Sequence, residues 1–253
     1  MAQPSSEFYQ PARNRPLAVI EDVPERAMVV CAHPDDAEIG VGGAVAKWAA
    51  AGCDIVYVVC TSGSAGSNDP RSRSRDVVPA RQREQRAAAS VLGVQEVIFL
   101  DHPDGGLEDD RAFRGELVGA IRTHRPHTVF CHDPHRIRGF QHRDHRVVGT
   151  VTADAIYPYA RDHLHFAEQI EDGLEPHKVR RLLMWGADEP DVVVDVTGYV
   201  DRQIEALGKH QSQVGGLTGG VGFDERLRAR ARLAGAHNGF EQGETFRQLI
   251  ARA

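Results

Sequence analysis

The sequence predicts an α/β fold in which helices cover both faces of a mostly parallel, doubly wound sheet. Short apolar runs rich in β-branched residues alternate with longer segments of helical periodicity, four times in succession. The run at residues 54–60 (DIVYVVC) is almost wholly apolar, as is typical of a parallel strand buried on both faces. Parallel strands also need long crossover connections, which the helical segments supply.

Four strand–helix pairs are expected in the first two thirds of the chain. The strands are predicted at residues 27–30, 54–60, 97–100 and 128–131. The helices that follow them are predicted at residues 44–51, 80–92, 111–124 and 147–157. Pro79 and Gly93 bound the second helix, since proline favours the start of a helix and glycine the position just past its end.

The last third of the chain is less regular. Strands are predicted at residues 179–185 and 192–196, and helices at residues 197–211, 225–233 and 244–253. Residues 214–222 (VGGLTGGVG) are too rich in glycine for a packed element, so we expect a loop or lid. Because no linker or internal repeat divides the chain, residues 1–253 are expected to form one domain, with residues 1–26 as an N-terminal arm.

The composition is ordinary for a soluble globular protein, since 41% of the 253 residues are apolar and 26% are charged. The formal net charge of -6 argues against nucleic acid or another polyanion as a general partner. No apolar stretch is long enough to span a bilayer, and the N-terminus lacks the apolar region of a signal peptide. The sequence therefore predicts a cytoplasmic protein with no membrane partner.

The four cysteines form no C-x-x-C pair, and three of them lie in or at the end of apolar runs. They are Cys31, Cys53, Cys60 and Cys131. We expect buried free thiols in a reducing compartment rather than a disulfide framework.

The first candidate site follows the strand predicted at residues 27–30. His33, Asp35 and Asp36 stand where this strand ends and a helix begins. Ligands of open α/β sheets bind at the carboxyl ends of the strands. Imidazole and carboxylate suit Zn²⁺, and a second carboxylate could act as a base. In the simpler alternative, Asp35 or Asp36 only caps the following helix, and this stretch alone does not decide between the two.

Three glycines follow the acidic turn, at positions 40, 42 and 43. The pattern G-x-G-G differs from the G-x-G-x-x-G of dinucleotide-binding loops, and the acidic turn separates it from the strand. We therefore expect these glycines to allow a close approach of helix and sheet rather than to bind phosphate.

The second candidate site consists of His142, Asp144 and His145, which follow the strand at residues 128–131. The two histidines are one helical turn apart, so in a helix both could face one point. Asp144 is placed to orient a histidine by accepting its other ring N–H. A catalytic zinc ion usually has three protein ligands and one open position.

His33, Asp36 and His145 would supply those three ligands and leave Asp35 and His142 to move protons. Two independent His/Asp clusters at one sheet edge are hard to explain as solvated loops, so the pair predicts a metal site. Mixed His/Asp ligands favour zinc but also accept other divalent first-row ions.

The helix predicted at residues 80–92 carries Arg81 and Glu84 one turn apart, and a surface ion pair is the simplest account of them. Arginines are frequent between residues 71 and 86, which raises nucleic acid as an alternative partner. Ser, Gln, Asp and Glu interrupt these arginines, and the chain is acidic overall. A solvated helix is therefore favoured over a nucleic-acid interface.

These motifs together resemble the PIG-L/LmbE family of zinc-dependent N-deacetylases. The resemblance rests on AHPDD at residues 32–36, on Gly42 and Gly43, and on HRDH at residues 142–145. Arg81-x-x-Glu84 and the turn PDG at residues 103–105 support it, and it extends over most of the chain. It implies a Rossmann-like three-layer sandwich of the LmbE type.

The resemblance also implies residue roles. His33, Asp36 and His145 would bind zinc, and Asp35 would be the general base. His142 would stabilise the oxyanion or protonate the leaving amine, and Asp144 would orient His142 or His145. Arg81 and Asp104 would contact the substrate. Ala37 stands where the family often has glutamate, so the nearby Glu38 is given no catalytic role.

The implied activity is hydrolysis of the N-acetyl group of an N-acetylglucosamine-type amino sugar or its conjugate. Family resemblance also suggests a homo-oligomer with a small-molecule substrate. One alternative is an amidase that cleaves larger sugar-thiol conjugates. Another is a non-catalytic, Rossmann-like module that binds nucleotides or nucleic acid.

Overall fold

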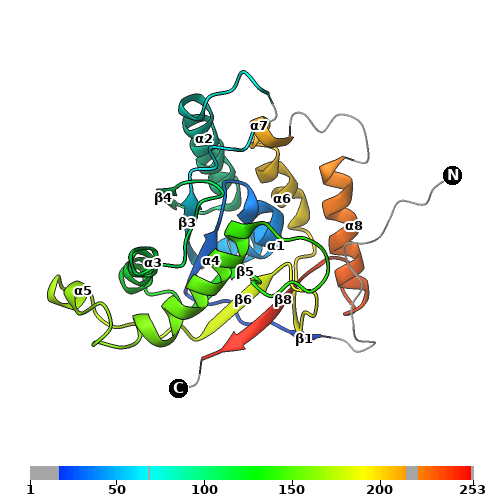
Figure 1. Ribbon diagram of the computed structural model, residues 1–253. Helices are drawn as coiled ribbons and strands as arrows, with labels where there is room; N and C mark the ends of the chain where they lie inside the picture. Colours follow the sequence, from blue (N-terminus) through cyan, green and yellow to red (C-terminus); the bar gives the residue numbers. More distant parts are fainter. Residues whose placement is uncertain (1–16, 68, 215–221, 252–253) are drawn as a thin grey trace.

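The computed structural model describes residues 17–67, 69–214 and 222–251. Its eight strands form one sheet in the order β1-β7-β8-β6-β5-β2-β3-β4 (Figure 1). They are β1 (Ala18–Val19), β2 (Arg26–Cys31), β3 (Asp54–Thr61), β4 (Glu96–His102), β5 (Thr128–His132), β6 (Arg181–Trp185), β7 (Val192–Asp195) and β8 (Gly243–Ile250). Every described pairing is parallel except those of β8, which runs antiparallel to β6 and β7. The prediction of a mostly parallel sheet is confirmed.

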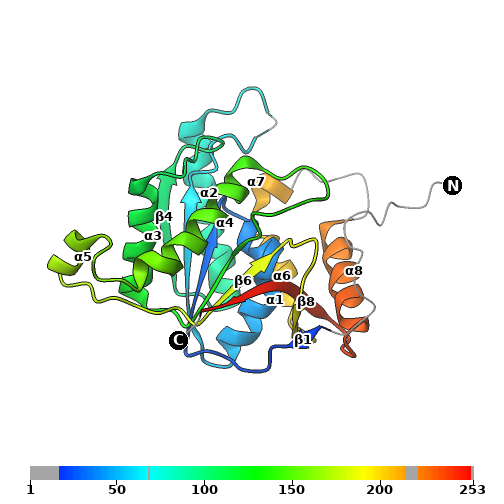
Figure 2. The ribbon, with the colours of Figure 1, turned by 60° about the horizontal axis from the view of Figure 1, so that its bottom comes forward.

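Helices cover both faces of this sheet, so the molecule has three layers (Figures 1 and 2). The helices are α1 (Asp36–Ala50), α2 (Ser74–Leu92), α3 (Arg111–His124), α4 (Arg143–Asp154), α5 (Ala167–Glu171), α6 (Val200–Leu207), α7 (Gln211–Val214) and α8 (Phe223–Ala236), and a kinked segment at Ala155–Ala160, with extended backbone at Tyr157, follows α4. Side chains of α1, α2, α6 and α8 share one hydrophobic core with the sheet, and those of α3 and α4 share the other. This is the doubly wound arrangement that the sequence predicts.

The central strands are apolar on both faces because both faces are covered. Along β2, Ala27 and Val29 belong to the core on the α1 side, whereas Met28 and Val30 belong to the core on the α3 side. All four are at most 1% exposed. Full burial of a side chain such as Val or Met contributes roughly 1.5–3 kcal/mol, so this pattern fixes the strand in the middle of the sheet.

Helix α1 begins at Asp36 rather than near residue 44, because packing overrides the low helix propensity of its glycines. A Cβ atom on Gly40 would lie 2.6 Å from the ring of Trp185, and one on Gly42 would lie 2.7 Å from Cγ of Gln203. At Gly43 it would lie 3.0 Å from a carboxylate oxygen of Glu244. The glycines therefore allow close packing, as predicted.

Other helix boundaries also differ from the predicted ones, and α4 begins at Arg143 rather than at residue 147. Helix α2 begins at Ser74, and Pro79 lies inside it instead of opening it. The predicted helix at residues 197–211 is divided into α6 and α7, which a short turn separates. Such shifts are expected where helix ends depend on tertiary contacts as well as on local sequence.

The helix predicted at residues 244–253 is wrong, because this segment forms strand β8. The strand fills the space between β6 and β7 and pairs with both. Phe246 is fully buried and packs on Phe130, with 5.4 Å between ring centroids. Arg247 donates from Nε to Oδ2 of Asp133 over 2.6 Å. These contacts are long-range, so no local periodicity could reveal them.

The predicted N-terminal arm is partly described. Residues 18 and 19 form β1, which pairs with β7 at the edge of the sheet. Residues 1–16, and residues 215–221 of the predicted glycine-rich loop, lie outside the described residues. All four cysteines are buried free thiols, as predicted. Among the described helices, none has the length and apolar character needed to cross a bilayer.

The order of strands creates a switch point beside β2. From β2 the chain continues to β3 and β4 on one side, and then crosses to β5 on the other side. Ligands of doubly wound sheets bind at such a point, outside the carboxyl ends of the strands. The turn that carries His33 follows β2, and the loop that leads to His142 follows β5. The topology therefore brings the two candidate clusters together.

Candidate active site

The turn after β2 has an unusual backbone at Asp35, with φ of 102° and ψ of -25°. A non-glycine residue in this region is strained, at a cost of order 1–3 kcal/mol, and such residues cluster at functional sites. Asp35 occupies the N-cap position of α1, yet its side chain makes no capping hydrogen bond. Instead, Asp36 accepts from the backbone N–H of His33 over 2.8 Å. Capping therefore does not account for the side chain of Asp35.

The turn after β5 presents two histidines at the start of α4. His142 is the N-cap residue, and its Nδ1 accepts the backbone N–H of Asp144 over 3.1 Å. Because that nitrogen is an acceptor, a neutral His142 ring carries its proton on Nε2. Its side chain is 45% exposed, while that of Asp144 is fully buried. His142 therefore offers an N–H donor at the open side of the site.

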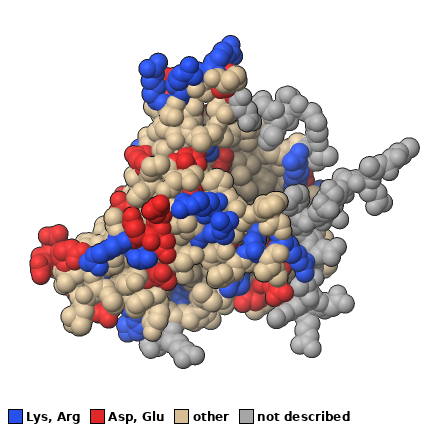
Figure 3. Space-filling view, viewed as in Figure 1, with Lys and Arg blue, Asp and Glu red and all other residues tan. Residues whose placement is uncertain are grey.

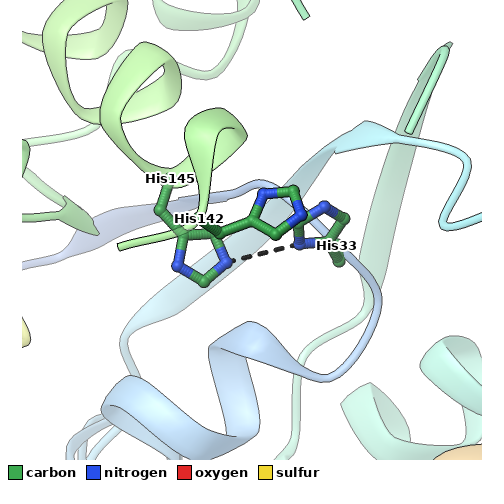
Figure 4. Close-up of side chains that lie close together, drawn as sticks. All are labelled: His33, His142 and His145. Carbon is green, nitrogen blue, oxygen red and sulfur yellow. Dashed lines mark hydrogen bonds between the residues drawn. The ribbon is translucent and has the colours of Figure 1, made fainter. Parts of the chain in front are cut away.

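His33 and His145 lie close together beside His142 (Figure 4), and Asp36 approaches both His33 and His145. Nδ1 of His33 lies 3.3 Å from Nε2 of His145 and 3.3 Å from Oδ2 of Asp36. Nε2 of His145 lies 3.2 Å from Oδ1 of Asp36. Two ligands about 2.1 Å from one tetrahedral zinc ion are about 3.4 Å apart. This cluster of two imidazoles and a carboxylate could hold a metal ion.

His132 is buried beside Asp36 and His145. No role is predicted for it from the sequence. Its Nε2 lies 3.3 Å from Oδ2 of Asp36. Its ring stacks on His145 with 3.9 Å between centroids and 18° between planes. Among the described residues, three groups have donor atoms close enough to hold a metal: Asp36, His132 and His145; His33, His142 and His145; and His33, Asp104, His142 and Asp144. The signal in the sequence is a histidine at the very end of a buried strand, directly before the polar loop.

Two carboxylates approach the other ring nitrogen of His33. Nε2 lies 3.2 Å from Oδ1 of Asp104 and 3.3 Å from Oδ2 of Asp144. Asp144 also accepts from the backbone N–H of Gly105 over 2.7 Å. The structure therefore places the carboxylate of Asp144 against His33. The hydrogen bond between Asp144 and His142 is made by the backbone N–H of Asp144. Asp104 is likewise engaged with His33, whereas a contact with the substrate is predicted from the family resemblance.

Arg81 is only 3% exposed and faces the turn that carries Asp35. Its Nη2 lies 3.2 Å from Oδ2 of Asp35 and also donates to the carbonyl of Pro34. Glu84 accepts from the N–H and hydroxyl of Ser212. In the described structure the two residues therefore have separate partners, and a surface ion pair between them is not the explanation of this motif.

Comparison with known proteins places the chain in a family. A family profile described as GlcNAc-PI de-N-acetylase, PIG-L, matches residues 28–156. The chain is 30% identical over 189 residues to the diacetylchitobiose deacetylase of Thermococcus kodakarensis, an alignment that covers 75% of this chain and 70% of the relative. The chain belongs to the PIG-L family. Both candidate clusters lie inside the matched residues.

Two further similarities extend over most of this PIG-L chain. It is 29% identical over 229 residues to the 1D-myo-inositol 2-acetamido-2-deoxy-alpha-D-glucopyranoside deacetylase of Mycobacteroides abscessus, covering 75% of this chain and 81% of the relative. The solved structure of the N,N'-diacetylchitobiose deacetylase from Pyrococcus horikoshii matches with a TM-score of 0.81 and 25% identity, covering 91% of this chain and 88% of that one. All three relatives are deacetylases.

The electrostatics of this PIG-L site favour a cation between the clusters. Burial disfavours the charged form of His33, but hydrogen bonds to Asp104 and Asp36 outweigh it and raise the pKa of His33 to about 10. Burial likewise disfavours the charged form of Asp36, but His145 and His132 hold the pKa of Asp36 well below its usual range. A field that favours a proton on His33 favours a metal cation in the same place.

The two remaining groups have different protonation behaviour. Burial and the negative charge of Asp36 raise the pKa of Asp35, and the opposing effect of Arg81 is smaller. Burial and the nearby His33 lower the pKa of His142, which keeps this ring neutral at neutral pH. Asp35 is therefore suited to accept a proton, and His142 to donate a hydrogen bond.

Proposed function

We propose that the protein is a zinc-dependent N-deacetylase that releases acetate from an N-acetylglucosamine-type amino sugar or its conjugate. The observation that carries the proposal is the convergence of His33, Asp36 and His145 beside a second carboxylate, Asp35, whose pKa is raised. The family match and the names of the relatives support the same chemistry. They support an amino sugar as the substrate class as well.

His33, Asp36 and His145 would hold the metal, since their donor atoms are spaced as ligands of one ion and their set of two imidazoles and a carboxylate suits zinc. When bound, zinc polarises a carbonyl and lowers the pKa of a coordinated water towards about 7. The side chains of His33 and Asp36 are each 10% exposed and that of His145 is 25% exposed. The ligands are thus shielded from bulk water yet open on the side of His145.

Asp35 would take the proton of the attacking water. A general base works best when its pKa lies near the working pH, and burial beside Asp36 raises the pKa of Asp35 in that direction. Arg81 would hold the carboxylate in place through Oδ2 and leave Oδ1 for the water. This role is an addition to the predicted contact of Arg81 with substrate hydroxyls.

His142 would donate from Nε2 to the oxyanion of the tetrahedral intermediate. Its Nδ1 accepts a backbone N–H, so the ring is fixed in orientation and in tautomer. This arrangement favours hydrogen bonding to the oxyanion over proton transfer to the leaving amine, because a neutral ring has no second proton to give. Asp104 would contact a substrate hydroxyl, and this contact would replace its present contact with His33.

Substituting Asp35 by Asn should abolish the base while leaving the metal ligands intact. We expect kcat to fall by roughly 10²–10⁴-fold, with the zinc dissociation constant changed by less than about threefold. Amine release measures the first quantity and chelator competition the second. Asp76→Asn, at an exposed aspartate in the first turn of α2, is the matched control. Unchanged turnover in Asp35→Asn would contradict the proposed base.

A screen of N-acylated glucosamine conjugates separates the deacetylase from the amidase. The proposal expects free amine and acetate from N-acetyl compounds, loss of this activity with chelator, and recovery with Zn²⁺. Preferential cleavage of larger acyl groups from sugar-thiol conjugates would favour the amidase instead. Activity that survives complete removal of metal would contradict the proposed chemistry.

The alternative of a nucleic-acid-binding module has little support from the charge distribution. On the face shown in Figure 3, basic and acidic side chains are interspersed, and the basic group at the top overlies the start of α2. In that region Arg71 pairs with Asp69, and Arg75 with Asp76. Tight, salt-dependent binding to DNA or RNA would be needed to revive this alternative.

A further inference from the structure

A chain of buried polar side chains ends at the backbone of Asp35. Glu38, Gln85 and His210 are each 0% exposed. They come from three separate parts of the sequence: the first turn of α1, the middle of α2 and the turn between α6 and α7. None of them belongs to the clusters that could hold a metal among the described residues. The proposed mechanism does not use them.

The hydrogen bonds of this series converge on the carboxylate of Glu38, from His210 on one side and from Asp35 through Gln85 on the other. His210 lies with Nε2 3.2 Å from one carboxylate oxygen of Glu38. Gln85 donates from Nε2 to the other oxygen over 2.9 Å. The carbonyl of the Gln85 side chain then accepts the backbone N–H of Asp35 over 3.0 Å. Because Glu38 fixes which end of the Gln85 amide is the donor, it also directs the acceptor end towards Asp35.

This series of hydrogen bonds ends at Asp35, the residue of the site with a strained backbone. Asp35 has φ of 102°, and a non-glycine residue keeps such a backbone only when its surroundings hold it there. The hydrogen bond from its N–H to Gln85 is one restraint on this peptide, and the contacts of Arg81 with Pro34 and Asp35 are others. The backbone at Asp35 decides where its carboxylate points relative to the neighbouring Asp36.

A purely structural account would treat Glu38 as a buried carboxylate that has found enough donors. That account leaves unexplained why the amide of Gln85 is turned to the N–H of the strained residue. We propose that Glu38 and Gln85 are positioning residues, which hold the backbone of Asp35 so that its carboxylate stands apart from Asp36 as the general base. His210 anchors the far end of the chain. The inference rests on the proposed function, in which Asp35 is the base.

The first test is Gln85→Met, which keeps the length of the side chain and removes both hydrogen bonds. We expect kcat to fall by about 10–100-fold, as displaced catalytic groups commonly cause, with KM changed by less than about threefold. The zinc dissociation constant should stay within about threefold of wild type, since the proposed ligands are untouched. Gln82→Met is the matched control: the same change one turn away on α2, where Gln82 is bonded to Asp101 on the outer side.

The second test is the exchange variant Glu38→Gln/Gln85→Glu. Gln85→Glu alone sets two buried carboxylates against each other and should impair turnover. In the exchange variant every link is restored. The new amide at position 38 donates to the new carboxylate at position 85, and that carboxylate accepts from the N–H of Asp35. We expect its kcat to recover to within about fivefold of wild type. Recovery of kcat together with the wild-type backbone at Asp35 would support positioning, and the exchange tests this even where Gln85→Met does not fold.

Crystal structures of the zinc-loaded proteins give a readout independent of activity. In Gln85→Met, φ of Asp35 should leave the positive region or the carboxylate should move towards Asp36. An unmoved Asp35, a kcat like that of Gln82→Met, or a folded exchange variant without recovery would overturn the inference. Wild-type protein that releases no amine would instead count against the proposed function, while the position of Asp35 would still test the inference.

Discussion

Asp35 and Asp36 are neighbours with the same side chain, yet the site treats them differently. Asp36 faces His145 and His132, which stabilise its ionised form. Asp35 has Arg81 as its ion-pair partner and lies beside the charge of Asp36, which disfavours its own ionisation. The backbone at Asp35 is left-handed, and the two carboxylates have different partners, Arg81 for Asp35 and the histidines for Asp36. Two neighbouring carboxylates whose pKa values are shifted in opposite directions are suited to different tasks, here those of the proposed ligand and the proposed base.

Replacing His132 by Ala should weaken zinc binding without removing a proposed ligand. His132 contacts Asp36 and stacks on His145, so its loss frees both side chains to move. Residues that orient metal ligands typically contribute about 10–100-fold to metal affinity. Chelator competition measures this change. His177→Ala, which removes another buried histidine bonded to the carbonyl of Pro126, should leave the affinity unaltered. Equal affinities in wild type and His132→Ala would show that the stack is not needed.

At the scale of elements, helix α1 links packing to the proposed metal site. Its first turn carries Asp36, and its glycines lie against the side chains of β6, α6 and β8. Trp185, which meets Gly40, also packs on His132 with 4.5 Å between ring centroids. A change in the fit of α1 against the sheet is therefore transmitted to both the proposed ligand Asp36 and its neighbour His132.

Gly40→Ala should destabilise the protein by about 1–3 kcal/mol, because the new methyl group would overlap the rigid ring of Trp185. Gly119→Ala in α3 is the matched control. There the nearest atom to an added Cβ is 3.5 Å away, so alanine should be neutral or stabilise by up to about 1 kcal/mol. Urea denaturation measures both free energies of unfolding. If Gly40→Ala is as stable as Gly119→Ala, close packing of α1 is not the reason for the glycine.

The elements differ in how far the sequence could predict them. Strand β3 and the parallel sheet were predictable because a strand covered on both faces is apolar throughout. The residues of the two clusters were predictable too, since the first cluster follows β2 directly and the second lies at the start of the helix after β5. Strand β8 was not, because its pairing with β6 and β7 joins distant segments. The contacts of Asp144 and Arg81 were likewise out of reach, as they depend on the three-dimensional course of two loops.

At the scale of the whole molecule, zinc binding should couple to the stability of the fold. The proposed ligands come from the turn after β2 and from the start of α4, on the two sides of the switch point. An ion that binds only the folded state stabilises it by about 2.7 kcal/mol at 100 times its dissociation constant. For a chain of this size, each kcal/mol raises Tm by roughly 2–4 °C.

Calorimetry with zinc and with chelator therefore should show a rise in Tm of roughly 5–11 °C when zinc is present at that excess. His145→Ala removes one proposed ligand from the start of α4, so the rise should shrink or vanish in this variant. Because residues 1–253 are predicted to form one domain, a single cooperative transition is expected in each case. A full zinc-dependent rise in His145→Ala would exclude His145 as a ligand, and two resolved transitions would contradict a single domain.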